Sequence, residues 1–406
     1  MVGPHWRRRD LRHAWSLPKG GRVRASAARE ARWVLELIVE LTLEGSFRDA
    51  QIVVSVDGRV QWVYCALMAD WSPFADLDPD VPGLVVGVAS GRSIVASASF
   101  GSATPAGERL GDDSTFYVAS IAKQFTAAAI AWLVLDRAVA LDDSVRQWIP
   151  ELGVGWDPVR LRHLLAHTGG LCDGNAVDDQ AGWGVNSTST TWDRVAIIAE
   201  TDPESKPGTI HRYSNHGYVL LAAVVERATG HKLGEFARDE LFPAAGMTAS
   251  RFLDVAGTPP VPGWVGGSAR VDIQFTCCGD GGLVTSLADL AAWNGWLPAS
   301  RLAPLMLGDR PSLPNGRIAH DAWGISIRTH RGLRIESHGG SIEGYMASFV
   351  RFPSEALTVI SLANSDALGV AEFGVRLRLL ADSLSTDRLD PTRPPWNETH
   401  HDLERP

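Results

Sequence analysis

The sequence predicts an α+β fold, in which an antiparallel sheet is flanked by helices and accompanied by a mostly helical subdomain. Strand-like runs occur near both ends of the regular part of the chain, at 81–103, 345–353 and 357–364. The stretch between them is dominated by helical patterns. This arrangement predicts a sheet assembled from the segment after Val81 and the segment after about residue 300.

Local patterns predict the elements in chain order. Residues 81–103 hold two strand-like runs around a Ser-Gly-Arg turn, which predicts a β-hairpin. The alanine-rich, apolar stretch 120–143 predicts a largely buried helix. A second helical pattern covers 217–242, and residues 369–384 have the spacing of an amphipathic closing helix.

The chain upstream of the hairpin is less regular. An apolar segment at 33–43 precedes strand-like residues on either side of the turn dipeptide Asp57-Gly58. We therefore divide the chain into a basic leader with a poorly assigned N-terminal extension (1–78), one domain (79–384, its helical subdomain at about 146–300) and a mobile, Pro-rich C-terminal tail (385–406).

Composition and charge narrow the classes of protein. Of the 406 residues, 45% are hydrophobic and 21% are charged, as is ordinary for a soluble globular protein. The first 32 residues carry nine lysines and arginines against two acidic residues, a net +7, so the remainder of a chain of net charge −9 carries −16. We expect a solvated basic leader on an acidic protein and no nucleic-acid partner, since a nucleic-acid arm would rest on residues 7–32 alone.

The sequence contains no recognisable membrane span or export signal. No run approaches the ~18 apolar residues that a transmembrane helix needs. The apolar segment 33–43 carries Glu36 and Glu40, and no small-residue cleavage site follows it promptly. The chain is therefore expected to be cytoplasmic, and nothing in it predicts an oligomeric state.

Ser120 and Lys123 form a Ser-x-x-Lys motif at the start of the predicted central helix. Residues three apart share a helix face, so the amine can accept the proton of the hydroxyl if burial keeps the lysine partly neutral. A serine at a helix start is also often only a cap. Ser16-Leu17-Pro18-Lys19 matches the motif equally well, but its proline and loop-like surroundings make it accidental.

Two further motifs favour catalysis over capping. Tyr213-Ser214-Asn215 supplies a phenol that can relay a proton and an amide that can bind both the lysine and a substrate carbonyl. His338-Gly339-Gly340-Ser341 precedes a strand, and its small residues let a substrate lie against the strand edge.

With these three motifs in this order, the sequence resembles the serine hydrolases of the class C β-lactamase and D-alanyl-D-alanine carboxypeptidase type, a β-lactamase-related group that includes esterases and D-aminopeptidases. The resemblance covers about Val81 to Leu384 and implies a β-lactamase/transpeptidase-like fold with its active site in a cleft between the two subdomains. Other matching stretches are 141–152, 161–171, 241–250 and 279–293.

The resemblance implies a role for each motif residue. Ser120 would be the acylated nucleophile, Lys123 its proton acceptor, and Tyr213 the group that acts with the lysine and protonates the leaving group. Asn215 would orient substrate and lysine. The backbone N–H groups of Ser120 and Ser341 would form the oxyanion hole, and Gly339 and Gly340 would give the acyl donor room.

His338 departs from the lactamase pattern, which commonly has a lysine there to attract a substrate carboxylate. A histidine with the usual pKa of ~6.5 is mostly neutral at pH 7 and binds an anion less firmly. The sequence therefore predicts a serine hydrolase that forms an acyl-enzyme from an ester, peptide or amide, or lactam carbonyl, of esterase or D-amino-acid peptidase type. A true β-lactamase is the alternative, and a non-catalytic scaffold or binding protein is the alternative of another class.

Competing sites are weak. His163 and His167 have the i, i+4 spacing of zinc ligands, but no His-Glu-x-x-His motif surrounds them and no third ligand is evident. His167-Thr168-Gly169 also matches His-x-Gly, and we expect it to support the site as a structural histidine. We predict no metal and no cofactor, and a small-molecule or peptide substrate as the partner.

Overall fold

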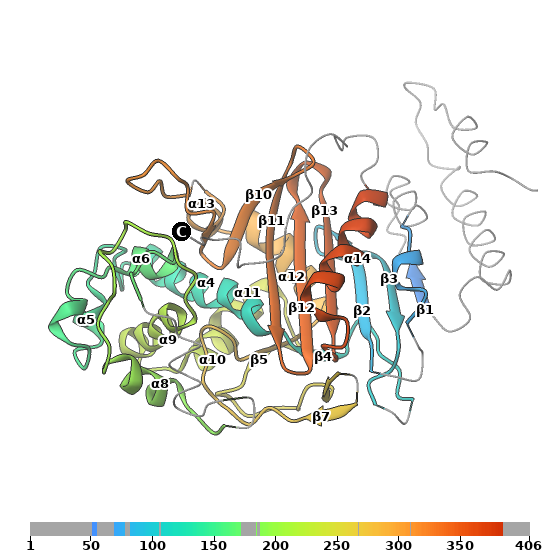
Figure 1. Cartoon of the computed structure of the whole chain (residues 1–406), viewed down its shortest axis with the longest axis horizontal. Coiled ribbons are helices and arrows are strands. Elements are labelled where there is room, and N and C mark those ends of the chain that lie inside the picture. Colours follow the sequence, from blue (N-terminus) through green and yellow to red (C-terminus); the bar gives the residue numbers. More distant parts are fainter. Residues whose placement is uncertain are drawn as a thin grey trace, which may run out of the picture.

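The computed structural model confirms the α+β architecture, with one large sheet, helices on both of its faces and a helical region at one side (Figure 1). It describes residues 51–54, 69–77, 82–104, 107–171, 184, 187–266, 268–308 and 310–384. Several predicted segments lie outside the described residues: the basic leader, the apolar segment 33–43, the strand after Asp57-Gly58 and the tail 385–406.

The main sheet joins the two ends of the fold, as predicted. Within the described residues its eight strands are all antiparallel and lie in the order β1-β3-β2-β13-β12-β11-β10-β9. Strand β13 pairs with β2 on one side and β12 on the other, which closes the sheet between the chain's two halves. The strands are β1 (Gln51–Val54), β2 (Leu84–Ser90), β3 (Ser93–Phe100), β9 (Asp321–Ala322), β10 (Ile325–His330), β11 (Leu333–Ile342), β12 (Tyr345–Phe352) and β13 (Leu357–Ala363).

The predicted hairpin is confirmed as β2 and β3, joined by a turn in which Gly91 has φ +55°. A positive φ at this position suits glycine, which has no Cβ to clash with the backbone. Residues of β12 and β13 are buried along the whole length of both strands. This continuous burial reflects a sheet that is covered on both faces.

Helices cover both faces of the sheet. Helix α12 (Leu287–Trp296) packs against β2, β3 and β13, while α14 (Gly369–Leu384) covers the opposite face, where it lies in front of the strands in Figure 1. The span of α14 is the one predicted from its amphipathic pattern. It also holds the segment 69–77, because Arg376 pairs with Asp76 and the buried ring of Phe74 belongs to the same apolar cluster.

The helical region contains α4 (Ala122–Leu135), the predicted central helix, which is buried over most of its length. It ends earlier than the apolar pattern suggested, because Arg137 adopts a left-handed φ of +60°. None of the helices in the described part of the chain has the length and apolar character needed to span a bilayer. The other helices are η1 (Ser72–Phe74), η2 (Ala119–Ile121), α5 (Val145–Trp148), η3 (Val154–Trp156), α6 (Leu161–Leu165), α8 (Thr191–Ile198), α9 (Asn215–Thr229), α10 (Leu233–Phe236), η4 (Ala237–Leu241), α11 (Phe242–Ala245), η5 (Leu297–Ala299), α13 (Ala303–Met306) and η6 (Pro353–Glu355).

Two small sheets complete the fold and position the site. Strand β8 (Leu283–Ser286) lies between β4 (Thr115–Tyr117) and β5 (Arg251–Phe252), and β6 (Gly263–Val265) pairs with β7 (Ala269–Val271). Strand β4 leads directly into η2, and β8 follows the loop 279–282. Their antiparallel pairing places this loop beside Ser120.

Candidate active site

Ser120 lies in η2, a single 3-10 turn that leads into α4, and its side chain is partly exposed. The preceding residue, Ala119, has a φ of +44°, a conformation that costs a non-glycine residue roughly 1–3 kcal/mol. This bend ends β4 and starts α4 within a few residues. Ser120 is therefore held at the entrance of the helix, close to the predicted position.

Lys123 is fully buried in the first turn of α4. Its Nζ donates to Ser120 Oγ at 3.0 Å, to Asn215 Oδ1 at 2.8 Å and to the backbone carbonyl oxygen of Asp280 at 2.7 Å. Three acceptors around one amine fix its position relative to the serine hydroxyl.

Burial lowers the pKa of Lys123 to about 8, because desolvation disfavours the ammonium form. The Asp280 carboxylate acts in the opposite direction and raises this pKa. The net effect leaves a useful fraction of neutral amine near pH 7, which is the form that can accept the proton of Ser120.

Tyr213 lies beside this pair. The centroid of its ring is 5.0 Å from Lys123 Nζ, and its phenol lies close enough to Ser120 for the serine to influence its pKa. Burial raises the pKa of Tyr213 well above 10, while the neighbouring Ser120 acts to lower it. The phenol is therefore protonated at neutral pH, and it is placed to donate a proton.

His167 supports Tyr213 from behind, in agreement with the structural role expected for it. The two rings stack with centroids 4.5 Å apart, and His167 Nδ1 accepts the backbone N–H of Ser214 at 3.0 Å. Burial lowers the pKa of His167 well below 6.5, so the imidazole is neutral and can accept this bond. A left-handed φ of +54° at His167 brings its ring against Tyr213.

Asn215 is the first residue of α9. The side chain of Ser214 caps this helix by accepting the N–H of Gly217 at 3.2 Å. The cap sets where the helix begins, and the amide oxygen of Asn215 then reaches Lys123. In the Tyr-Ser-Asn motif, Tyr213 thus places its phenol ring beside Lys123, Ser214 caps α9, and Asn215 accepts a hydrogen bond from Lys123.

Strand β11 carries His338, Gly339, Gly340 and Ser341, and it lies directly against η2. A Cβ atom on Gly340 would be 2.2 Å from the carbonyl oxygen of Val118 and 3.2 Å from the backbone nitrogen of Ser120. Pairing with β10 runs from Leu333 to Ser337, whereas pairing with β12 continues to Ile342. Residues 338–342 therefore form no ladder with β10, and an extended peptide could pair with β11 along this edge.

His338 is buried, and its Nδ1 donates to the carbonyl oxygen of Gly339 at 2.6 Å. Its ring centroid lies 6.2 Å from that of Tyr213. Ser341, three residues further along β11, is exposed. One face of the imidazole is therefore tied to its own strand through Nδ1, and this position holds no lysine.

The loop 279–282 is a part of the site for which the sequence predicted no role. Its contribution is the carbonyl oxygen of Asp280, which side-chain motifs cannot reveal. Gly281 has no room for a Cβ, which would lie 2.4 Å from the hydroxyl of Tyr117, and that hydroxyl accepts the N–H of Gly282 at 3.0 Å. The Gly-Asp-Gly-Gly sequence was the available signal, since glycines mark close backbone approach.

The two histidines with zinc-like spacing are engaged separately. His163 Nδ1 accepts the N–H of Arg160 at 3.1 Å, and His167 accepts that of Ser214. In the part of the chain that the structure describes, no group of three or more His, Cys, Asp or Glu side chains is arranged to hold a metal ion.

Comparison with known proteins gives consistent results. A model of the beta-lactamase family matches residues 60–382. A D-aminopeptidase of Cereibacter sphaeroides is 29% identical over 298 residues, which is 70% of this chain and 57% of that protein. Penicillin-binding protein 4* of Bacillus subtilis is 27% identical over 68% of this chain and 67% of its own. The chain thus spans little more than half the length of the D-aminopeptidase.

Solved structures show the same fold. The octameric penicillin-binding protein homologue from Pyrococcus abyssi superposes with a TM-score of 0.64 at 24% identity, covering 77% of this chain and 76% of that one. The D-amino acid amidase from Ochrobactrum anthropi, complexed with D-phenylalanine, gives 0.65 at 18% identity, covering 80% and 98%. The predicted β-lactamase/transpeptidase-like fold is therefore confirmed.

Proposed function

Because the chain belongs to the beta-lactamase family, we propose that it is a serine hydrolase that cleaves amide or ester bonds through an acyl-enzyme at Ser120. The proposed substrates are small molecules or peptides with a D-amino-acid acyl group, or related esters. The names of the relatives support this class: D-aminopeptidase for one and penicillin-binding protein for another.

One observation carries the proposal: a buried lysine of lowered pKa donates to the hydroxyl of a serine one helical turn away. Burying an ammonium group is costly. A neutral side chain could fill a purely structural role at a lower cost in desolvation free energy. General-base catalysis, in contrast, needs an amine whose pKa lies near the working pH.

In the proposed reaction, Ser120 Oγ attacks the substrate carbonyl as Lys123 takes the hydroxyl proton. The carbonyl oxygen becomes an oxyanion, which the backbone N–H groups of Ser120 and Ser341 would stabilise. Collapse of the tetrahedral intermediate breaks the bond to the leaving group, which receives a proton from Tyr213. The lysine can then return a proton to the phenolate, and water releases the acyl group by the reverse sequence.

Asn215 and β11 would position the substrate. The amide oxygen of Asn215 is committed to Lys123, which leaves its NH₂ group to bind the acyl carbonyl. An extended substrate would lie along residues 338–342, with Gly339 and Gly340 leaving room for it. His338 would orient the substrate through the strand and Tyr213, without a cation to hold a carboxylate.

We also propose that residues 79–384 form the hydrolase domain, with the helical subdomain at about 146–300. The main sheet and the helices on its faces lie largely within this range. Two segments of the N-terminal extension also pack on this domain. Strand β1 pairs with β3, and residues 69–77 pack on α14.

The test is intact-mass analysis after exposure to a fluorophosphonate. We expect one adduct on the wild type and none on Ser120→Ala. The matched control is Ser268→Ala, which removes an exposed hydroxyl in the β6–β7 turn and should be labelled like the wild type. An adduct that persists in Ser120→Ala would contradict the assignment of the nucleophile.

Turnover of p-nitrophenyl butyrate and nitrocefin, measured in parallel, separates the alternatives. Hydrolysis of the ester with little turnover of nitrocefin is the expected result. Preferred hydrolysis of nitrocefin would identify a true β-lactamase. Neither adduct nor turnover would favour a non-catalytic binding protein on the same fold.

A further inference from the structure

Asp280 places a carboxylate next to the nucleophile. Its carbonyl oxygen is 2.7 Å from Lys123 Nζ, which is 3.0 Å from Ser120 Oγ. The carbonyl oxygen therefore lies no more than about 6 Å from the reacting hydroxyl. The carboxylate belongs to the same residue and its charge acts on Lys123, so it lies within electrostatic range of the lysine next to the reacting hydroxyl.

The side chain of Asp280 forms no direct contact with a cationic side chain among the described residues. It is partly exposed, and no hydrogen bond or ion pair to its side-chain oxygens occurs in the part of the chain that the structure describes. Glycines at 279, 281 and 282 surround it, so no neighbouring side chain in this loop shields its charge. A carboxylate in this setting keeps oxygens that are free to accept hydrogen bonds from a substrate.

The charge of Asp280 acts on the reacting groups. It raises the pKa of Lys123 and also raises the pKa of two tyrosines, Tyr117 and Tyr213. These three groups lie on β4, on α4 and just before α9, so the carboxylate lies within electrostatic range of all three elements. His338 bonds to Gly339 through its Nδ1, and residues 338–342 contain neither lysine nor arginine.

We propose that Asp280 determines specificity by binding the α-ammonium group of the acyl donor. The α-nitrogen of an amino-acid amide or ester is two bonds from the scissile carbonyl carbon. It must therefore lie near Asp280 when that carbon meets Ser120. The same charge repels acyl donors that carry a carboxylate close to the scissile bond. This inference rests on the proposed function and selects, within it, substrates with a free amino terminus.

The test compares two substrates that differ by one charge: D-alanine p-nitroanilide and N-acetyl-D-alanine p-nitroanilide. At pH 7 an α-amino group is largely protonated. We expect the wild type to favour the free amine in kcat/KM by about tenfold or more, the size of one partly screened charge pair. Raising the ionic strength should reduce that preference and leave the acetylated substrate almost unaffected.

Asp280→Asn should reduce the preference about tenfold, because it removes the charge while the backbone carbonyl that binds Lys123 remains. Asp280→Glu should retain most of it. The matched control is Asp113→Asn, an exposed carboxylate outside the proposed site, which should keep the wild-type ratio. An equal ratio in wild type and Asp280→Asn, or a wild type that favours the acetylated substrate, would overturn the inference.

Fluorophosphonate labelling of Ser120 distinguishes a failure of the Asp280 inference from a failure of the proposed hydrolase function. Absence of labelling would remove the proposed function itself. If Ser120 is labelled but neither anilide is cleaved, protection of Ser120 by D-alanine amide is compared with protection by N-acetyl-D-alanine amide. Stronger protection by the free amine, lost in Asp280→Asn, supports the inference. Equal protection, or none, refutes it while the nucleophile assignment stands.

Discussion

The lowered pKa of Lys123 is a consequence of its surroundings. An exposed lysine has a pKa near 10.4 and is almost entirely an ammonium ion at pH 7. In the first turn of α4 the side chain is excluded from water, and its pKa falls to about 8 despite the opposing charge of Asp280. The neighbouring imidazole of His167 is neutral and adds no charge that would change this balance.

The pH dependence of acylation follows from this residue. Only the neutral amine accepts the proton of Ser120, and its population grows as pH rises through the pKa. We expect kcat/KM for a neutral ester to increase tenfold per pH unit below about 8 and to level off above it. A profile that rises up to pH 10, or an active Lys123→Arg variant, would contradict a lysine base.

The lowered pKa of Lys123 also makes the free energy of unfolding depend on pH. Between pH about 8 and the unfolded value near 10.5, the unfolded chain holds a proton at Lys123 that the folded chain has released. The contribution of this residue to the free energy of unfolding therefore rises with pH across that window.

At the scale of elements, β11 contacts η2, and in the proposed mechanism this contact would bring together the two backbone N–H groups of the oxyanion hole. Gly340 makes this contact possible, since a Cβ there would overlap the carbonyl of Val118. Left-handed backbone at Ala119 and His167 lies on either side of the same region. Strain of this kind is typical of sites whose geometry is imposed by the surrounding fold.

Gly340→Ala should therefore separate β11 from η2. A displacement of about 1 Å at a reacting centre can cost ~100-fold in rate, so we expect labelling of Ser120 to slow by about that factor. Gly111→Ala is the matched control, because a Cβ there meets nothing within 4 Å and the backbone φ is not positive. Circular dichroism would verify folding. Equal labelling rates of the two variants would refute the role of this contact.

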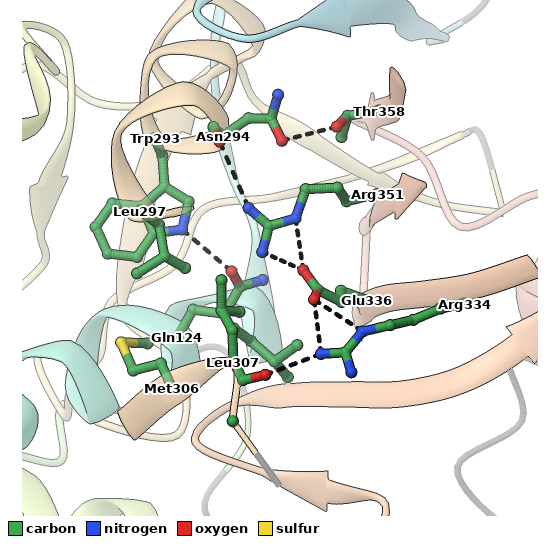
Figure 2. A network of polar contacts seen from close by, with 12 residues as sticks. Gln124, Trp293, Asn294, Leu297, Met306, Leu307, Arg334, Glu336, Arg351 and Thr358 are labelled. Atoms are coloured by element: carbon green, nitrogen blue, oxygen red, sulfur yellow. Dashed lines mark hydrogen bonds and ion pairs between the residues drawn. The ribbon is translucent and has the colours of Figure 1, made fainter. Parts of the chain in front are cut away.

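At the scale of the whole molecule, a buried polar network joins the sheet to the helix behind it (Figure 2). Glu336 on β11 accepts from Arg351 on β12 at 2.7 Å and pairs with Arg334 at 2.9 Å. Arg351 reaches the carbonyl of Asn294 on α12, whose side chain accepts from Thr358 on β13. Glu336 lies two residues before His338, so the network anchors the strand that carries the third motif.

Glu336→Gln should destabilise the fold markedly. Glu336 and Arg351 have side chains only 5% and 7% exposed, and removing the carboxylate leaves a buried guanidinium without its counter-charge. We expect the free energy of unfolding to fall by about 3–5 kcal/mol. Asp157→Asn, which breaks a surface pair with Arg146, should cost under about 1 kcal/mol. Urea denaturation distinguishes them, and similar losses would contradict a structural role for the buried pair.

Much of the fold could be predicted because it depends on short-range patterns. The amphipathic stretch 369–384 corresponds to α14, and the apolar runs at 345–353 and 357–364 became β12 and β13. The central helix was placed correctly but ends at Leu135, before the predicted end at residue 143, because Arg137 adopts a left-handed φ of +60°. A single backbone angle of that kind leaves little trace in the sequence.

The candidate site also contains groups that the sequence could predict and groups that it could not. Ser120, Lys123, Tyr213 and Asn215 were identifiable because their side chains have a recognisable chemistry and spacing, and the structure brings these four together. The carbonyl of Asp280 could not be identified, since every residue has one.

By itself, the sequence determined most local elements, the family and the side chains proposed to react, because these depend on neighbouring residues and on chemical identity. The tertiary structure alone decided how far burial lowers the pKa of Lys123 and which backbone and side-chain groups surround its amine. Both depend on burial and on distances between residues such as Lys123, Asn215 and Asp280, which are far apart in the chain and meet only when the sheet and helices pack.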